Sequence, residues 1–183
     1  MVNRRLLLLA PFGVAVAAGA GMYSVLGRMR TGTFDPHDVP SQLLGRPVPS
    51  FDLPAQAPGQ GFGSADLQAL GRPVLLNFFA SWCVPCVIEH PELMALSRAG
   101  VPIWGIAYKD TVPAASGFVA RHGNPYARIA RDAPGQVAID WGVYGVPESY
   151  LIDPQGIVRW RMAGPLTPDT VSEQLQPLLR AMA

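Results

Sequence analysis

The chain has 183 residues, of which 49% are hydrophobic and 15% are charged, so it has room for one globular domain and an apolar extension but for no second full domain. Its formal net charge is +1 at pH 7, and it contains no run of lysines and arginines that would follow a phosphate backbone. Nucleic-acid binding is therefore excluded as a function class, and we expect no nucleic-acid partner.

The N-terminal segment is an uncharged, apolar stretch over residues 6–27, with basic residues on both sides. About 20 apolar residues suffice for a helix to cross a bilayer, whereas the apolar core of a signal peptide usually has about 7–15. We therefore expect residues 1–27 to be a single-pass transmembrane anchor in a lipid bilayer. Cleavage as a signal peptide is the alternative, because Ala18-Gly19-Ala20 resembles a small-residue cleavage site.

The remaining chain divides into a polar, proline-containing linker at residues 28–42 and a folded domain at residues 43–183. Apolar runs and turn residues predict, in chain order, a strand at 50–53, a flexible turn at 59–63, a helix at 64–70, a buried strand at 73–80, a helix at 83–97, a strand at 101–107, a helix at 114–122, a short element at 126–130, a helical turn at 136–140, a hairpin of 149–152 with 157–161, and a helix at 168–182. This order predicts an α/β fold, with a mixed central sheet flanked by helices.

The only two cysteines, Cys83 and Cys86, lie where the buried strand ends and the next helix begins. At a helix N-terminus, unpaired backbone N–H groups and the helix dipole stabilise an anion, so the first sulfur can be held as the thiolate that attacks disulfides. Two intervening residues bring the second sulfur back within one helical turn, where it can resolve a mixed disulfide. The placement predicts a redox pair in which Cys83 attacks and Cys86 resolves.

Three other uses of the cysteine pair have weaker support. Zinc needs two further ligands, and the three histidines stand at no recognisable ligand spacing, so we expect no metal site. Covalent haem attachment needs a histidine directly after the second cysteine, where the chain has Val87. A purely structural disulfide stays open, although a loop closed over two residues removes little entropy from the unfolded chain.

The sequence around the cysteines, residues 74–86 (VLLNFFASWCVPC), resembles the active-site strand and turn of the thioredoxin superfamily. Residues 108–110 (YKD), 123–127 (GNPYA) and above all 142–153 (GVYGVPESYLID) are similar to the CcmG/DsbE proteins, which are periplasmic thiol-disulfide oxidoreductases of bacterial cytochrome c maturation. The resemblance runs from about residue 43 to the C-terminus and implies a thioredoxin-like fold.

The resemblance also implies roles for residues outside the cysteine pair. It makes Pro147 a cis-proline that faces the cysteines, with Val146 before it offering backbone groups to an incoming peptide. It places Glu89 and Glu148 around the active site, although each could instead be a solvated surface carboxylate.

Asn77 departs from the general thioredoxin pattern, in which a buried Asp accepts a proton from the second cysteine, but it agrees with the CcmG pattern. An amide takes up no proton at neutral pH, so proton transfer from Cys86 would involve Glu89, Glu148 or water. A hydrogen-bonded core Asn is the structural alternative.

Four further side chains lie close to the pair in the sequence. We expect Trp82 to pack beside the sulfurs and to shield one side of them. Val84 and Pro85 are short and apolar, so they supply no cation that would stabilise a thiolate. We expect His90 on the surface of the helix.

By resemblance, the protein is anchored in the bacterial inner membrane with its catalytic domain in the periplasm. It would reduce a disulfide of apocytochrome c or of a maturation thiol protein, and a membrane electron donor of the DsbD/CcdA type would recharge it. No metal or organic cofactor is needed.

Three alternative functions remain open at this point. One is an anchored thioredoxin-like reductase of another pathway, such as oxidase assembly or general disulfide reduction, and another is a redox-inactive thioredoxin-fold module that binds peptides. A peroxidase is disfavoured, because Ala80 rather than Thr stands three residues before Cys83.

Overall fold

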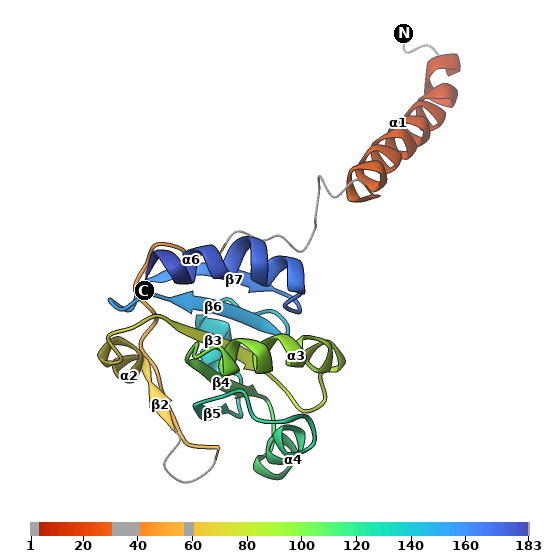
Figure 1. Cartoon of the computed structure of the whole chain (residues 1–183). Helices are drawn as coiled ribbons and strands as arrows, with labels where there is room; N and C mark the ends of the chain where they lie inside the picture. The colour runs from red at the N-terminus through yellow and green to blue at the C-terminus, as the bar shows by residue number, and fades with distance from the viewer. Residues whose placement is uncertain (1–3, 31–40, 57–60, 183) are drawn as a thin grey trace. The chain divides into compact units, whose positions relative to one another are not determined.

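The computed structural model describes residues 4–30, 41–56 and 61–182, which belong to two compact units, Met1–Pro40 and Ser41–Ala183 (Figure 1). The described part of the first unit is one helix, α1 (Arg4–Arg30), so residues 4–27 of the segment expected to be an anchor are helical. In the part of the chain that the structure describes, no helix is both long and apolar enough to cross a membrane. Residues 31–40 of the expected linker lie outside the described residues.

A five-stranded sheet in the order β5-β4-β3-β6-β7 forms the centre of the second unit (Figure 1). The strands are β3 (Val74–Phe79), β4 (Ile103–Tyr108), β5 (Arg128–Asp132), β6 (Glu148–Ile152) and β7 (Val158–Ala163). β4 runs parallel to both of its neighbours, whereas β6 runs antiparallel to β3 and to β7. This is the mixed central sheet that the order of elements predicted.

β3 is the innermost strand, and all six of its residues are buried. Because successive side chains of a strand point to opposite faces, its odd-numbered and even-numbered residues enter different cores. Leu75 and Phe79 belong to one hydrophobic cluster, and Val74, Leu76 and Phe78 belong to the other. An apolar run, interrupted only by the hydrogen-bonded Asn77, is therefore the composition that suits this strand.

Helices cover both faces of the sheet. One face carries α3 (Val84–Arg98), α4 (Val112–His122) and a C-terminal helix that begins with a π-helical segment, η1 (Thr170–Leu175), and continues as α6 (Gln176–Ala181). The other face carries α2 (Ser64–Ala69) and α5 (Gln136–Asp140). The cysteines belong to the first of these two cores.

The predicted flexible turn at residues 59–63 is wrong in its described part. Phe62–Gly63 forms a short strand, β2, that pairs with β1 (Asp52–Leu53). Gly63 lies so close to the neighbouring strand that an added Cβ would meet the carbonyl oxygen of Phe51 at 2.5 Å. The glycine is thus required by the close approach of two backbones.

Candidate active site

The two cysteines form a disulfide with an S–S distance of 2.01 Å at the N-terminus of α3. Cys83 is the N-cap residue, and its sulfur accepts a hydrogen bond from the backbone N–H of Cys86 at 3.1 Å. Both cysteines are buried, while Val84 and Pro85 between them are exposed. Pro85 suits this place because its fixed φ fits the first turn of a helix, where its missing N–H costs no intrahelical bond.

The loop before β6 approaches the sulfurs from the other side. The antiparallel pairing of β3 with β6 sets Phe78 opposite Glu148, so residues 146 and 147 lie beside the end of β3. The Val146-Pro147 peptide bond is cis, and the carbonyl oxygen of Val146 lies 3.4 Å from the sulfur of Cys83. A carbonyl oxygen in this position can accept a hydrogen bond from a reduced, protonated Cys83 but disfavours its thiolate.

Asp110, two residues after the end of β4, fixes the turn that leads from β3 to Cys83. Its carboxylate accepts hydrogen bonds from the backbone N–H of Ser81 at 2.6 Å, from the hydroxyl of Ser81 at 3.0 Å and from the N–H of Thr111 at 2.8 Å. We did not single out Asp110 as a site residue from the sequence. The sequence signal that could have identified Asp110 is its position just after the strand β4, because β4 runs parallel to β3 and both strands therefore end at the same edge of the sheet.

Trp82 is less enclosed than expected, because 58% of its surface is exposed. Its ring lies 6.3 Å from that of Tyr108, and its indole N–H donates to the carbonyl oxygen of Lys109 at 3.4 Å. It therefore contacts the Asp110 loop and presents the rest of its ring to solvent.

A fully buried polar network lies between α3 and the sheet. The amide nitrogen of Asn77 donates to Glu89 Oε1 at 2.9 Å and to the Ser149 hydroxyl at 3.0 Å, and its oxygen accepts from the Tyr126 hydroxyl at 2.8 Å. The backbone N–H of Leu166 donates to Glu89 Oε2 at 3.0 Å. Asn77 is thus a hydrogen-bonded core residue, as the structural alternative expected. Glu89 is buried and is not a surface carboxylate.

Burial raises the pKa of Glu89 from 4.5 to about 7, although the hydrogen bonds from Leu166 and Asn77 act in the opposite direction. Desolvation dominates because both donors are neutral, so neither offsets the cost of a buried charge. Glu89 lies one helical turn after Cys86 on the same buried face of α3. A carboxyl group with this pKa can both take up and release a proton near neutral pH.

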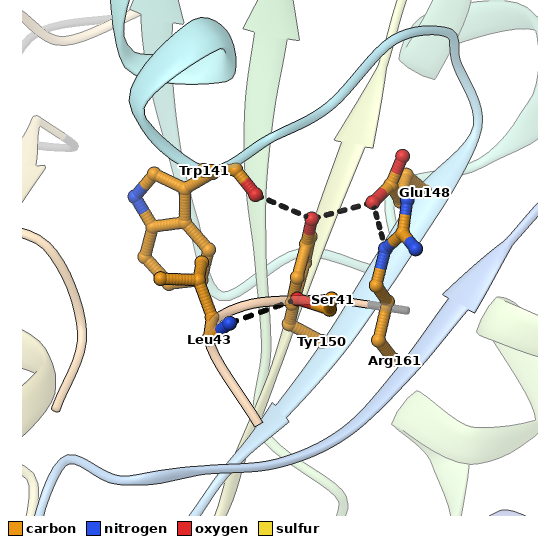
Figure 2. A network of polar contacts seen from close by, with 6 residues as sticks. All are labelled: Ser41, Leu43, Trp141, Glu148, Tyr150 and Arg161. Atoms are coloured by element: carbon orange, nitrogen blue, oxygen red, sulfur yellow. Dashed lines mark hydrogen bonds and ion pairs between the residues drawn. The ribbon is translucent and has the colours of Figure 1, made fainter. Parts of the chain in front are cut away.

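Glu148 belongs to a second buried network, which Figure 2 shows. Its Oε1 accepts hydrogen bonds from the Tyr150 hydroxyl and from Arg161 Nε, each at 2.5 Å, and the Tyr150 hydroxyl also lies 2.9 Å from the carbonyl oxygen of Trp141. Burial raises the pKa of Glu148, while Arg161 and Tyr150 lower it.

The two glutamates lie on opposite faces of the sheet. Residues alternate along β6, and its Tyr150 and Ile152 enter the core away from α3, so Glu148 points to that face as well. Ser149 points the other way and joins the Glu89 network. The structure therefore brings Glu89, but not the side chain of Glu148, to the face that holds the cysteines.

His90 is buried, and the expectation that it lies on the helix surface is wrong. Its Nε2 lies 3.0 Å from the carbonyl oxygen of Gly123, which identifies Nε2 as the protonated nitrogen, and its ring packs edge-on against Phe118. Burial lowers its pKa. Among the described residues, no three His, Cys, Asp or Glu side chains are gathered so that they could hold a metal ion.

Comparisons with known proteins agree with this geometry. Residues 43–176 match the Redoxin family. The chain is 41% identical to the thiol:disulfide interchange protein DsbE of Pseudomonas aeruginosa over 98% of this chain and 96% of the relative, and 42% identical to HelX of Rhodobacter capsulatus over 81% and 84%. Among solved structures, a secreted disulfide oxidoreductase of Mycobacterium tuberculosis, homologous to E. coli DsbE, superposes with a TM-score of 0.59 at 25% identity, over 72% of this chain and 95% of that one. The chain therefore belongs to the DsbE/CcmG family of thiol:disulfide interchange proteins and is a thiol-disulfide oxidoreductase with the redox pair Cys83–Cys86.

Proposed function

We propose that the protein reduces disulfides of apocytochrome c, or of a thiol protein of the same pathway, during cytochrome c maturation. The Cys83 thiolate attacks a partner disulfide, forms a mixed disulfide and releases one partner thiolate. Cys86 then loses its proton and attacks the Cys83 sulfur, which releases the second partner thiolate and leaves Cys83–Cys86 oxidised. The partner gains two electrons, and a membrane donor of the DsbD/CcdA type returns two electrons to the pair.

The partner class in this proposal comes from the family, and the observation that carries the redox step is the environment of the Cys83 sulfur. Its hydrogen bond from the Cys86 N–H supports the thiolate, and the adjacent Val146 carbonyl belongs to a backbone edge beside which a partner strand can pair. We assign proton acceptance from Cys86 to Glu89, because Glu89 shares the buried face of α3 with Cys86 and its pKa is about 7. Asn77 would hold that carboxyl in place, and Trp82, Pro85, Val146 and Pro147 would shape the partner site.

We further propose that residues 1–27 anchor the protein in the bacterial inner membrane, with residues 28–42 as the linker and residues 43–183 as the periplasmic domain. The support is the uncharged stretch at residues 6–27, which lies within α1. Membrane fractionation with carbonate washing tests this proposal. Retention in the washed membranes is expected, and recovery of a soluble form that begins near residue 21 would contradict it.

The catalytic proposal is tested by trapping partners on Cys86→Ala. Cys83 still attacks in this variant, but no thiol remains one helical turn away to resolve the product, so mixed disulfides should accumulate. Nonreducing gels and mass spectrometry then identify the trapped proteins, and the variant that lacks both cysteines is the matched control. If Cys83 carries only glutathione and unrelated proteins, the cytochrome c assignment is wrong, while the oxidoreductase assignment stands.

A further inference from the structure

The outer face of α3 is apolar over its first two turns. Val84, Val87 and Ile88 are 71%, 39% and 66% exposed, and Pro85 and Pro91 are exposed as well. A surface helix usually shows charged and polar side chains to solvent. The fold does not need these apolar residues, because the opposite face of α3 supplies Leu93 and Leu96 to the core.

These side chains form a continuous stripe that begins at the redox pair. Val84, Ile88 and Pro91 follow the spacing i, i+4 and i+7, which places them on one side of a helix, and Val87 lies beside them. Glu89 and His90 are both buried on the other side of α3, and the half-exposed Glu92 borders the end of the stripe. We call residues 84, 87, 88 and 91 the α3 stripe.

We propose that the α3 stripe docks an apolar, uncharged segment of the disulfide-bearing partner, next to the cysteine that Cys83 attacks. This inference rests on the proposed function and adds the chemistry of the partner. Contiguous exposed apolar surface on a soluble domain marks an interaction site. The occupant follows from position, because a mixed disulfide on Cys83 fixes the partner chain directly beside Val84, where the stripe begins.

The stripe would also discriminate against acidic partners. A carboxylate placed on it loses hydration, and the nearest charge on α3 is the half-exposed Glu92, which has the same sign. An apolar side chain gains from the area that both surfaces remove from water. Small disulfides that reach only the sulfur should not sense the stripe.

The test compares two peptides with the same Cys-Ala-Ala-Cys disulfide, one flanked by Leu and Val and the other by Ser and Glu. With the full-length reduced protein, we expect the apolar peptide to be reduced about tenfold faster. Ile88→Lys should lower this preference to less than about threefold and leave the rate with hydroxyethyl disulfide unchanged. Ile139→Lys on α5 is the matched control, because Ile139 is 63% exposed, and it should keep the preference.

Equal rates for the two peptides with the unmodified protein would overturn the docking proposal, as would equal effects of Ile88→Lys and Ile139→Lys. The proposed function would survive either result, because hydroxyethyl disulfide is still reduced. A failure to reduce any of the three disulfides would contradict both proposals. A loss of self-association in Ile88→Lys, measured by sedimentation, would assign the stripe to a second copy of the chain and overturn the partner assignment.

Discussion

Replacement of Glu89 by Gln should change how the stability of the protein depends on pH. Burial raises the pKa of Glu89 from 4.5 to about 7, so the folded protein binds a proton at this carboxyl more tightly than the unfolded chain does. The stability that this proton contributes is fully present below pH 4.5 and is lost as the pH rises to about 7. Gln carries no titratable proton and removes this dependence.

The magnitude follows from the size of the pKa change. One pKa unit corresponds to about 1.4 kcal/mol, so a rise from 4.5 to about 7 amounts to about 3 kcal/mol of unfolding free energy lost between pH 4.5 and pH 8. The Gln variant also places an amide N–H₂ where the Asn77 amide or the Leu166 N–H donates, which lowers its stability at every pH. Only the difference in slope between the two proteins therefore reports on the titration.

Urea unfolding of the oxidised protein, followed by tryptophan fluorescence at several pH values, measures this slope. All four tryptophans belong to the second unit, so the signal reports on that unit alone. Glu92→Gln, the same change at a half-exposed position of the same helix, is the matched control for the loss of a carboxylate. Parallel curves for the unmodified protein and Glu89→Gln between pH 4.5 and 8 would refute the reasoning.

Three further outcomes are expected. The redox pair should be more reducing than the strong oxidant DsbA, because the Val146 carbonyl oxygen lies 3.4 Å from the attacking sulfur and disfavours its thiolate. A reduction potential of about −120 mV, measured in glutathione buffers, would contradict this. Arg161→Met should lower the unfolding free energy by about 3 kcal/mol, because it leaves the buried Glu148 unpaired. Arg159→Met on the same strand should cost less than about 1 kcal/mol, because Arg159 is half exposed and its partner Asp153 keeps hydrogen bonds from the Gln155 and Ile157 N–H groups. Equal losses from the two variants would speak against a stabilising role of the buried Arg161–Glu148 pair. Asp110→Ala should cost about 2 kcal/mol, because the turn at Ser81 loses its acceptor, and chemical unfolding that shows less than about 0.5 kcal/mol would exclude this anchoring role.

Local sequence patterns could predict those helices, strands and turns whose side chains are set by burial or by turn geometry. The nearly continuous apolar run at residues 73–80 predicted a buried strand, because only a strand covered on both faces accepts apolar side chains at almost every position. The cysteines mark the helix start that follows, and the hairpin at residues 149–161 was found from its turn residues. The prediction for residues 61–63 was wrong, because their glycines allow a close contact with the backbone of residues 51–55 rather than a flexible turn.

The environments of the charged residues depended on contacts that no local pattern encodes. The spacing of Cys86, Glu89 and Leu93 does place Glu89 on the core side of α3, and this signal was available in the sequence. Its partner, the Leu166 N–H, lies 77 residues further along the chain. The face to which Glu148 points follows from the register of β6, which becomes known only when the strands are paired.

The two halves of the redox centre lie far apart in the chain, because Cys83 and Val146 are separated by 63 residues. At about 5–20 residues per second, a ribosome adds the loop before β6 several seconds after the cysteines. During this interval the two thiols lack the Val146-Pro147 backbone that lies beside Cys83 in the folded protein. Since the chain contains only two cysteines, premature oxidation within the chain can close only one disulfide, the one present in the folded protein. The nascent chain therefore needs no disulfide isomerase to reach its native covalent connectivity.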